Sequence, residues 1–183
     1  MERFRKFLLI SAVCTLPLLA HTSSAAEAET PAVTATLKMP QALAAAGFTS
    51  FSALIEAAGL TQSLEAAGPF TCFAPTDACF AKIPAAKQKL FTEDPKNESV
   101  VRWIRYHFVE GLAMDREMLV NQVSGAHTMD KGYMRIWVTP GQISINKTSP
   151  LVITDIPAAN GIIHGVSVPL EPPDAMPVVP AQP

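Results

Sequence analysis

Hydrophobic residues follow helical spacing in the first half of the chain and a strand-like alternation in the second half. Three Ala- and Leu-rich groups lie between residues 41 and 66, and Gly47, Gly59 and Gly68 follow them. Because glycine is common just after the last residue of a helix, these groups predict three short helices. We predict further helices over residues 76–82, 85–91 and 116–121, the last capped by Asp115, and one from Ser99 that runs into a strand at Tyr106 and His107.

Runs of β-branched and aromatic residues, separated by turn residues, dominate the second half of the chain. The Pro140-Gly141 and Asn160-Gly161 pairs mark two of the turns. Helices followed by antiparallel strands predict an α+β domain with a packed sheet, and the lack of an internal repeat predicts a single module. The expected strands cover residues 70–74, 126–129, 133–138, 142–146, 151–154 and 163–170.

The segment GPFTCFAPTDACF combines a strand with the start of a helix. Alternate residues of the strand form one apolar side, and the proline after them ends the strand. The threonine or the aspartate that follows is expected to cap a helix, which carries a phenylalanine into the core. The residues of this first motif are Phe70, Thr71, Cys72, Ala74, Pro75, Thr76, Asp77 and Phe80.

The segment NGIIH, which ends at His164, is the second motif, and a Tyr106-His107 pair lies between the two motifs. A turn-forming Asn-Gly step precedes an apolar strand with one histidine. We interpret His107 and His164 as structural residues whose imidazoles bind backbone groups or Asp77, and Tyr106 as a packed ring. A hydrolase would need a nucleophile on a strained turn, which no Gly-x-Ser-x-Gly segment supplies, so we predict no catalytic residue.

The two motifs and the pair between them, in this order, resemble the fasciclin-like domain family over roughly residues 39–170. The first signature of the family matches the Ala-Pro-Thr-Asp step and Phe80. The second matches Asp155-Ile156 together with residues 160–164. After its histidine the chain departs from the family pattern, because the acidic and basic residues that usually follow are missing. Any partner contact that uses those charges is not expected here.

The resemblance implies an exported, non-enzymatic interaction module that works in cell-surface adhesion or in host or matrix association. Its partner would be a protein or a polysaccharide. A second hypothesis is a carrier of a lipophilic pigment or lipid, because some fasciclin-like proteins resemble carotenoid binders and methionine adapts to irregular apolar ligands. The groove would lie among the Ala-rich helices, near Met39, Met114, Met118 and Met129, unless these methionines fill the core.

The N-terminal segment has the three parts of a secretory signal peptide. Arg3, Arg5 and Lys6 are basic, the apolar run that follows is short, and small residues lie near residue 25. We predict export with removal of this leader, which leaves no membrane span; a retained anchor is the alternative. We expect a signal peptide over residues 1–25, a flexible arm over 26–38, a fasciclin-like domain over 39–171 and a Pro-rich tail over 172–183, in a protein that is periplasmic, at the cell surface or secreted.

The charge of the chain gives no indication of nucleic acid or anionic lipid as a partner. The chain contains 14 Lys and Arg against 16 Asp and Glu. Loss of Glu2, Arg3, Arg5 and Lys6 with the leader changes the net charge from −2 to −4. A mildly acidic chain without a Lys and Arg cluster lacks the basic surface that such partners need. The hydrophobic content of 49% predicts a globular body, which we expect to be a monomer.

Cys72 and Cys79 are the cysteines that remain after removal of the leader. An exported protein can form a disulfide, and a strand and the helix after it could bring these sulfurs together. Two buried free thiols are the other interpretation, and both stay open. The spacing is not the Cys-x-x-Cys of redox enzymes, and no further zinc ligands lie nearby, so we predict neither a metal nor a cofactor.

Two asparagines and two tryptophans have alternative interpretations. Asn97 and Asn146 each begin the tripeptide of an N-glycosylation site, although both segments also suit polar turns. Trp103 and Trp137 are expected to be core or half-buried residues, because a sugar-stacking platform would need both exposed on one face. Nothing in their predicted elements indicates such exposure.

Overall fold

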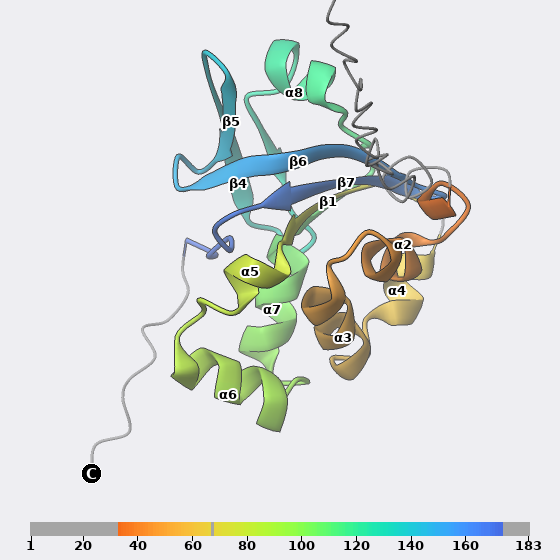
Figure 1. The fold of residues 1–183 in the computed structure, drawn as a ribbon, viewed down its shortest axis with the longest axis vertical. Coiled ribbons are helices and arrows are strands. Elements are labelled where there is room, and N and C mark those ends of the chain that lie inside the picture. Colours follow the sequence, from red (N-terminus) through yellow and green to blue (C-terminus); the bar gives the residue numbers. More distant parts are fainter. Residues whose placement is uncertain (1–32, 67, 174–183) are drawn as a thin grey trace, which may run out of the picture.

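A seven-stranded sheet forms the middle of the molecule, and helices pack on both of its faces (Figure 1). The computed structural model describes residues 33–66 and 68–173. The helices are α2 (Met39–Ala45), α3 (Thr49–Ala57), α4 (Thr61–Glu65), α5 (Asp77–Phe80), α6 (Ala85–Glu93), α7 (Glu98–Tyr106) and α8 (Arg116–Asn121). The strands are β1 (Phe70–Pro75), β2 (Phe108–Glu110), β3 (Gly125–His127), β4 (Tyr133–Thr139), β5 (Gln142–Ile145), β6 (Ser149–Ala158) and β7 (Gly161–Val166).

The sheet has the strand order β2-β1-β7-β6-β5-β4-β3 and is mixed, with one parallel pair. That pair joins β1 to β7 and places Phe70 opposite Gly161. All other neighbouring strands are antiparallel. The predicted α+β class is therefore confirmed, and the strands are antiparallel, as expected, except at this pair. No hairpin connects β1 to β7, so no turn dictates an antiparallel direction there.

Several element boundaries differ from the predictions, and β6, for example, spans Ser149–Ala158 rather than residues 151–154. The Tyr106-His107 pair is not a strand, because Tyr106 is the last residue of α7, His107 caps that helix and β2 begins at Phe108. The apolar stripe of α7 continues to its end, so helical packing extends further than the tyrosine and histidine suggested. Strand β7 ends at Val166 rather than at Leu170.

The first core lies between β1 and the helices below it in Figure 1. The side chains of Phe70, Cys72 and Ala74 all face this core, as the strand alternation predicts. Phe80 is half-buried and packs against two rings of the core, with centroid distances of 5.7 Å to Phe91 and 6.3 Å to Trp103. The first motif therefore brings its phenylalanine to the core edge rather than into the centre.

The second core lies on the opposite face of the sheet, beneath α8 (Figure 1). Phe73 points into it from β1, and Leu119 of α8 is fully buried there. Because alternate residues of β1 face different cores, the whole strand is buried. The remaining buried members of the second core are Tyr106, Val109, Met114, Met134, Ile136, Ile143, Ile145, Leu151, Val166 and Leu170.

The segment before α2 is packed rather than a flexible arm over residues 33–38. Thr34 is fully buried, and Leu37 packs against the first core. The carbonyl of Leu37 also accepts a hydrogen bond of 2.8 Å from the amide of Ala159. The signal peptide, the first part of the arm and the tail beyond residue 173 lie outside the described residues. Within residues 33–66 and 68–173, no helix is long and apolar enough to cross a membrane.

Candidate functional site

Asn160, in the turn between β6 and β7, connects four parts of the fold. Its Oδ1 accepts a hydrogen bond of 2.8 Å from the amide of Met39, at the start of α2. Its Nδ2 donates to the carbonyls of Leu64 at 2.8 Å and Ala66 at 3.0 Å, and its own carbonyl accepts from the amide of Phe70. The side chain is buried, so these bonds replace solvent entirely. Asn160 therefore acts as a structural junction.

Gly161 lies where the backbones of β1 and β7 approach each other closely. A Cβ atom at this position would overlap the carbonyl group of Phe70 and meet the Cε atom of Met39. Only glycine leaves room for the parallel pairing. The Asn-Gly step of the second motif thus supplies both a hydrogen-bonding junction and a close contact between strands.

His164 is fully buried in β7 and bonds to backbone groups through both ring nitrogens. Nδ1 accepts a hydrogen bond of 3.3 Å from the amide of Asp155, so Nε2 carries the proton that is donated to the carbonyl of Met114 at 2.7 Å. Burial lowers the pKa of His164 below its ordinary value, despite the Met114 bond and nearby carboxylates. The imidazole is therefore a neutral connector between two backbone segments.

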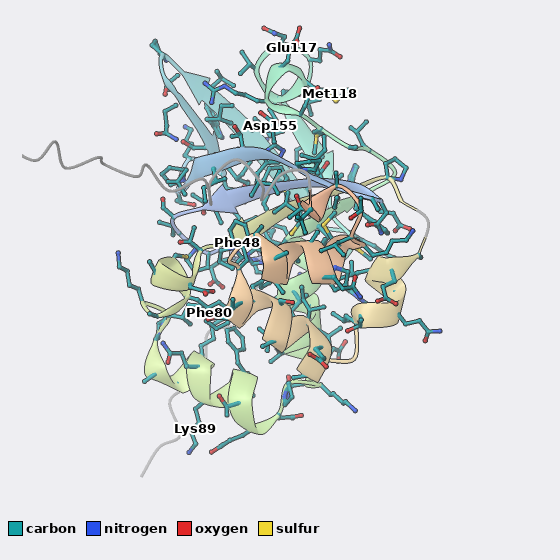
Figure 2. The ribbon with its side chains drawn as sticks, turned by 45° about the vertical axis from the view of Figure 1, so that its right-hand side comes forward. Phe48, Phe80, Lys89, Glu117, Met118 and Asp155 are labelled. Atoms are coloured by element: carbon teal, nitrogen blue, oxygen red, sulfur yellow. The ribbon has the colours of Figure 1, made fainter. Side chains whose placement is uncertain are left out.

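Asp155 links β6 to α8 from an unusual backbone position. Its φ of 63° lies in the left-handed region, within an irregular part of the β6–β7 pairing. Its carboxylate accepts a hydrogen bond of 2.7 Å from the amide of Arg116, the first residue of α8. Figure 2 shows Asp155 lying close to the α8 residues Glu117 and Met118. The acid of the second signature thus holds the start of a helix.

Thr71 holds the segment that precedes α8 from the other side. Its Oγ1 donates to the carbonyl of Leu112 at 2.7 Å and accepts from the amide of Met114 at 2.8 Å. The carbonyl of Met114 is in turn bound by His164. The two motifs therefore meet at this segment, where each contributes one buried polar side chain.

His107 plays a similar part at the end of α7. Its Nδ1 donates to the carbonyl of Trp103 at 2.8 Å, and its Nε2 accepts from the amide of Leu170 at 3.1 Å. Burial lowers the pKa of His107 to about 3. Neither His107 nor His164 bonds to Asp77, so that alternative of the sequence interpretation is wrong.

Tyr106 and Asn146 form a polar contact beside the second core. The Tyr106 hydroxyl donates to the carbonyl of Tyr133 at 3.2 Å and accepts from Nδ2 of Asn146 at 2.8 Å. Burial raises the pKa of Tyr106 above its ordinary value, although the Asn146 bond opposes the shift. The amide nitrogen of Asn146 is thus engaged in a structural bond. Asn97, the other candidate glycosylation residue, caps α7 by accepting from the amide of Ser99.

Thr76 and Asp77 cap two different helices. The Oγ1 of Thr76 accepts a hydrogen bond of 3.3 Å from the amide of Cys79 and so caps α5. The carboxylate of Asp77 accepts from the hydroxyl of Thr49 at 2.5 Å and from the amide of Ser50 at 2.9 Å, at the start of α3. Burial favours the protonated carboxyl, but these hydrogen bonds outweigh it and lower the pKa of Asp77.

Cys72 and Cys79 are buried free thiols, so the disulfide alternative is not realised in the structure. Burial raises the pKa of Cys72 well above its ordinary value and raises that of Cys79 to about 11, although Lys82 opposes the second shift. Thiols with raised pKa values hold little thiolate and react slowly. Within the part of the chain that the structure describes, no group of three His, Cys, Asp or Glu side chains is placed to hold a metal ion.

The methionines do not gather in one groove. Met39 and Met129 belong to the first core, whereas Met114 and Met118 belong to the second, on the other face of the sheet. Two surface hollows beside α8 and one beside Asn160 and Gly161 have no methionine in their lining. The arrangement supports the core-filling interpretation rather than a lipophilic carrier.

The exposed surface contains a feature that sequence reasoning missed. Among the described residues, six of the eight large hydrophobic side chains that are exposed lie between residues 120 and 153. Val120 of α8 and Val138 of β4 line a hollow of about 430 Å³ together with Arg116. A neighbouring hollow of about 560 Å³ includes Asp155. Val120, Val138 and the hollow that they line are here called the β4–α8 surface; the other four exposed side chains are Tyr133, Trp137, Val152 and Ile153.

Comparison with known proteins supports the resemblance found in the sequence. The sequence model of the Fasciclin domain matches residues 46–172. Protein sll1483 of Synechocystis is 31% identical over 132 residues, which are 70% of this chain and 71% of that protein. Mouse Stabilin-1 is 33% identical over 141 residues, which are 73% of this chain and only 5% of Stabilin-1.

Two further matches, one in sequence and one in structure, extend the comparison. Pig transforming growth factor-beta-induced protein ig-h3 is 28% identical over 69% of this chain, which spans 18% of that protein. A solved domain pair from the insect cell adhesion molecule Fasciclin I superposes with a TM-score of 0.64 at 20% identity. This match covers 74% of the chain and 51% of the domain pair, and it establishes the similarity of the folds.

Proposed function

Because this chain belongs to the fasciclin domain family, we propose that it is an exported interaction module that acts in adhesion at a cell surface or in contact with a host or matrix. Fasciclin domains are adhesion or interaction modules and are generally non-catalytic. The finer assignment of this chain to adhesion rests on the distribution of its side chains.

The contrast between the motif residues and the β4–α8 surface carries this proposal. The buried motif side chains Thr71, His107 and His164 all bond to backbone groups and so maintain the fold. No buried side-chain nitrogen or oxygen within residues 33–66 and 68–173 lacks a hydrogen-bond partner. The exposed apolar side chains of Val120 and Val138, by contrast, line one surface hollow between α8 and β4. Exposed apolar groups that lie together are typical of interaction surfaces.

An attachment assay with the full mature chain tests the proposal. Cells from the source would be applied to surfaces coated with the protein and to surfaces coated with heat-denatured protein. We expect attachment to the folded protein alone. The double variant Val120→Gln and Val138→Gln should reduce attachment, because it makes the hollow between α8 and β4 polar.

Lys89→Gln is the matched control for this assay. Lys89 lies on α6 at the opposite end of the molecule from the α8 residues Glu117 and Met118 (Figure 2). The control variant should attach cells as well as the wild type does. Equal attachment to folded and denatured protein would contradict the proposed function.

Export is tested separately. The predicted leader implies that the protein recovered from the periplasm, cell surface or medium begins near residue 26. Mass spectrometry of the N-terminal peptide identifies this end. An intact Met1 on protein confined to the cytoplasm would contradict the export part of the proposal.

A further inference from the structure

Strand β4 presents aromatic and cationic side chains in alternation on its outer face. Tyr133, Arg135 and Trp137 are exposed, whereas Met134 and Ile136 point the other way into the second core. The ring of His127 on β3 packs edge-on against Tyr133, with a centroid distance of 5.2 Å. Trp137, which we expected to be a core or half-buried residue, is 38% exposed. The outer β4 face is the name used below for the exposed side chains of His127, Tyr133, Arg135, Trp137 and Lys147.

Lys147 is held over Trp137 by the turn between β5 and β6. Its Nζ lies 3.9 Å from the centre of the indole ring, which is a close cation–π contact. Lys147 and Asn146 have φ values of 64° and 53°, in the left-handed region that favours glycine. Asn146 fixes the turn by accepting from the amide of Arg135 and donating to Tyr106. A lysine in a strained position is thus kept beside an exposed aromatic ring.

The outer β4 face is cationic although the chain as a whole is acidic. Residues 124–149 contain the cations Lys131, Arg135 and Lys147, while Asp130 is their one acidic residue. The Asp130 side chain is only 2% exposed and pairs with Arg102. The exposed charges of this segment are therefore all positive, a local excess that the net charge of −2 conceals.

We propose that the outer β4 face binds an acidic polysaccharide whose sugars carry carboxylate groups. This inference rests on the proposed function and names its partner class. The flat apolar faces of sugar rings suit Tyr133 and the part of the Trp137 ring that Lys147 leaves uncovered, while Arg135 and Lys147 supply donors for carboxylates. Aromatic and cationic residues alternate along one strand. This alternation matches a polymer in which apolar ring faces and carboxylate groups repeat together. A nucleic acid would need a longer row of cations, because its charges are denser.

Binding of the full mature chain to polygalacturonate tests this proposal, with fully methyl-esterified polygalacturonate as the uncharged comparison. Isothermal titration calorimetry and affinity electrophoresis both report the interaction. We expect binding to the acidic polymer, weakened by added salt because exposed charges are screened. We expect about tenfold weaker binding to the esterified polymer.

Three variants assign the binding to the outer β4 face. Trp137→Ala should weaken binding about tenfold or more, since it removes the stacking ring. Lys147→Gly should weaken it about fivefold while leaving the thermal midpoint unchanged or higher, because glycine relieves the left-handed backbone. Lys131→Gly is the matched control, since Lys131 also has a left-handed φ of 68° and carries one positive charge away from Trp137. It should change binding by less than about twofold.

The outcomes separate this inference from the proposed function. Equal binding to both forms of the polymer, or no effect of Trp137→Ala and Lys147→Gly, would overturn the inference. Tighter binding to single-stranded DNA than to polygalacturonate would overturn it in favour of a nucleic-acid partner. If cell attachment depends on Val120 and Val138 but not on Trp137, the proposed function stands while the outer β4 face is not its binding site.

Discussion

The junction between β1 and β7 and the outer β4 face use polar side chains in opposite ways. At the junction, Asn160 and His164 are buried and bond to backbone groups of distant segments. On the outer β4 face, Arg135 and Lys147 are exposed, next to an exposed indole. The family motifs therefore mark the residues that maintain the fold. The residues available for recognition lie where the motifs do not.

Replacing Gly161 with alanine should have the largest effect, because it acts on the junction itself. The added Cβ would overlap the carbonyl of Phe70, so β1 and β7 could no longer pair in register. We expect a loss of more than about 4 kcal/mol in the free energy of unfolding, measured by urea denaturation or seen as failure to fold. Gly47→Ala is the control for backbone conformation, since Gly47 has a φ of 89° but open space around it. It should cost about 1 kcal/mol. Similar losses for both variants would refute the steric argument.

Truncating the two tryptophans compares the buried and exposed regions directly. Trp103 is 2% exposed and its ring lies 4.8 Å from that of Phe91 and 4.4 Å from that of His107, between centroids. Trp103→Ala should reduce the free energy of unfolding by about 3–5 kcal/mol, because it leaves a cavity. Trp137→Ala should reduce it by about 1 kcal/mol or less, mainly through the lost cation–π contact. Urea midpoints of the two variants measure the difference. Equal losses would remove the distinction between a structural and a recognition tryptophan.

The parts that could be predicted from the sequence are those with local or repeated signals. Apolar periodicity located the helices, and α8 was predicted with its Asp115 cap. The packing of Phe70, Cys72 and Ala74 on one side follows directly from strand alternation. The family resemblance indicated that two motifs distant in sequence belong to one domain. It did not indicate that β1 and β7 run parallel.

The parts that could not be predicted depend on contacts between distant segments. Asp77 bonds to Thr49 and Ser50, which belong to an earlier helix, and nothing in the local sequence indicates this pairing. The outward position of Trp137 is consistent with the alternation of β4, but alternation alone does not say which side is covered. The place of Lys147 over that ring depends on a turn in the next hairpin. Recognition residues are hidden from the sequence for this reason.

Acid should weaken the fold through two buried histidines, His164 at the junction and His107 at the end of α7. His107 has a pKa lowered to about 3 by burial, and that of His164 is shifted in the same direction. Above about pH 6.5 both the folded and unfolded chains hold these rings neutral, so their protonation has no effect on stability. As the pH falls below that value, the unfolded chain gains protons that the folded chain cannot bind, and stability is lost. The loss from His107 alone should reach about 2 kcal/mol at pH 5.

Urea denaturation at pH 7.5, 6 and 5 measures this loss, and the imidazole NMR signals show whether the folded rings stay neutral. The variant His164→Gln keeps a hydrogen-bonding side chain without a titrating ring, so the slope of stability against pH should be smaller than in the wild type. Folded-state titration of both rings near pH 6.5 would rule out the mechanism.

Asp77 should give the smallest effect, since its hydrogen bonds lie at the edge of the first core. Asp77→Ala removes the acceptor for Thr49 and Ser50 and should reduce the free energy of unfolding by about 1 kcal/mol at pH 7. Asp77→Asn keeps an acceptor and should lose less. Because the fold lowers the pKa of Asp77, its contribution is present above the ordinary carboxyl pKa and disappears as the pH falls through the lowered value. The difference in urea midpoint between wild type and Asp77→Asn should therefore narrow in acid. A difference that stays constant with pH would show that the charge of Asp77 contributes nothing to the free energy of unfolding. The contact between α5 and α3 would then depend on the shape of the side chain and not on its charge.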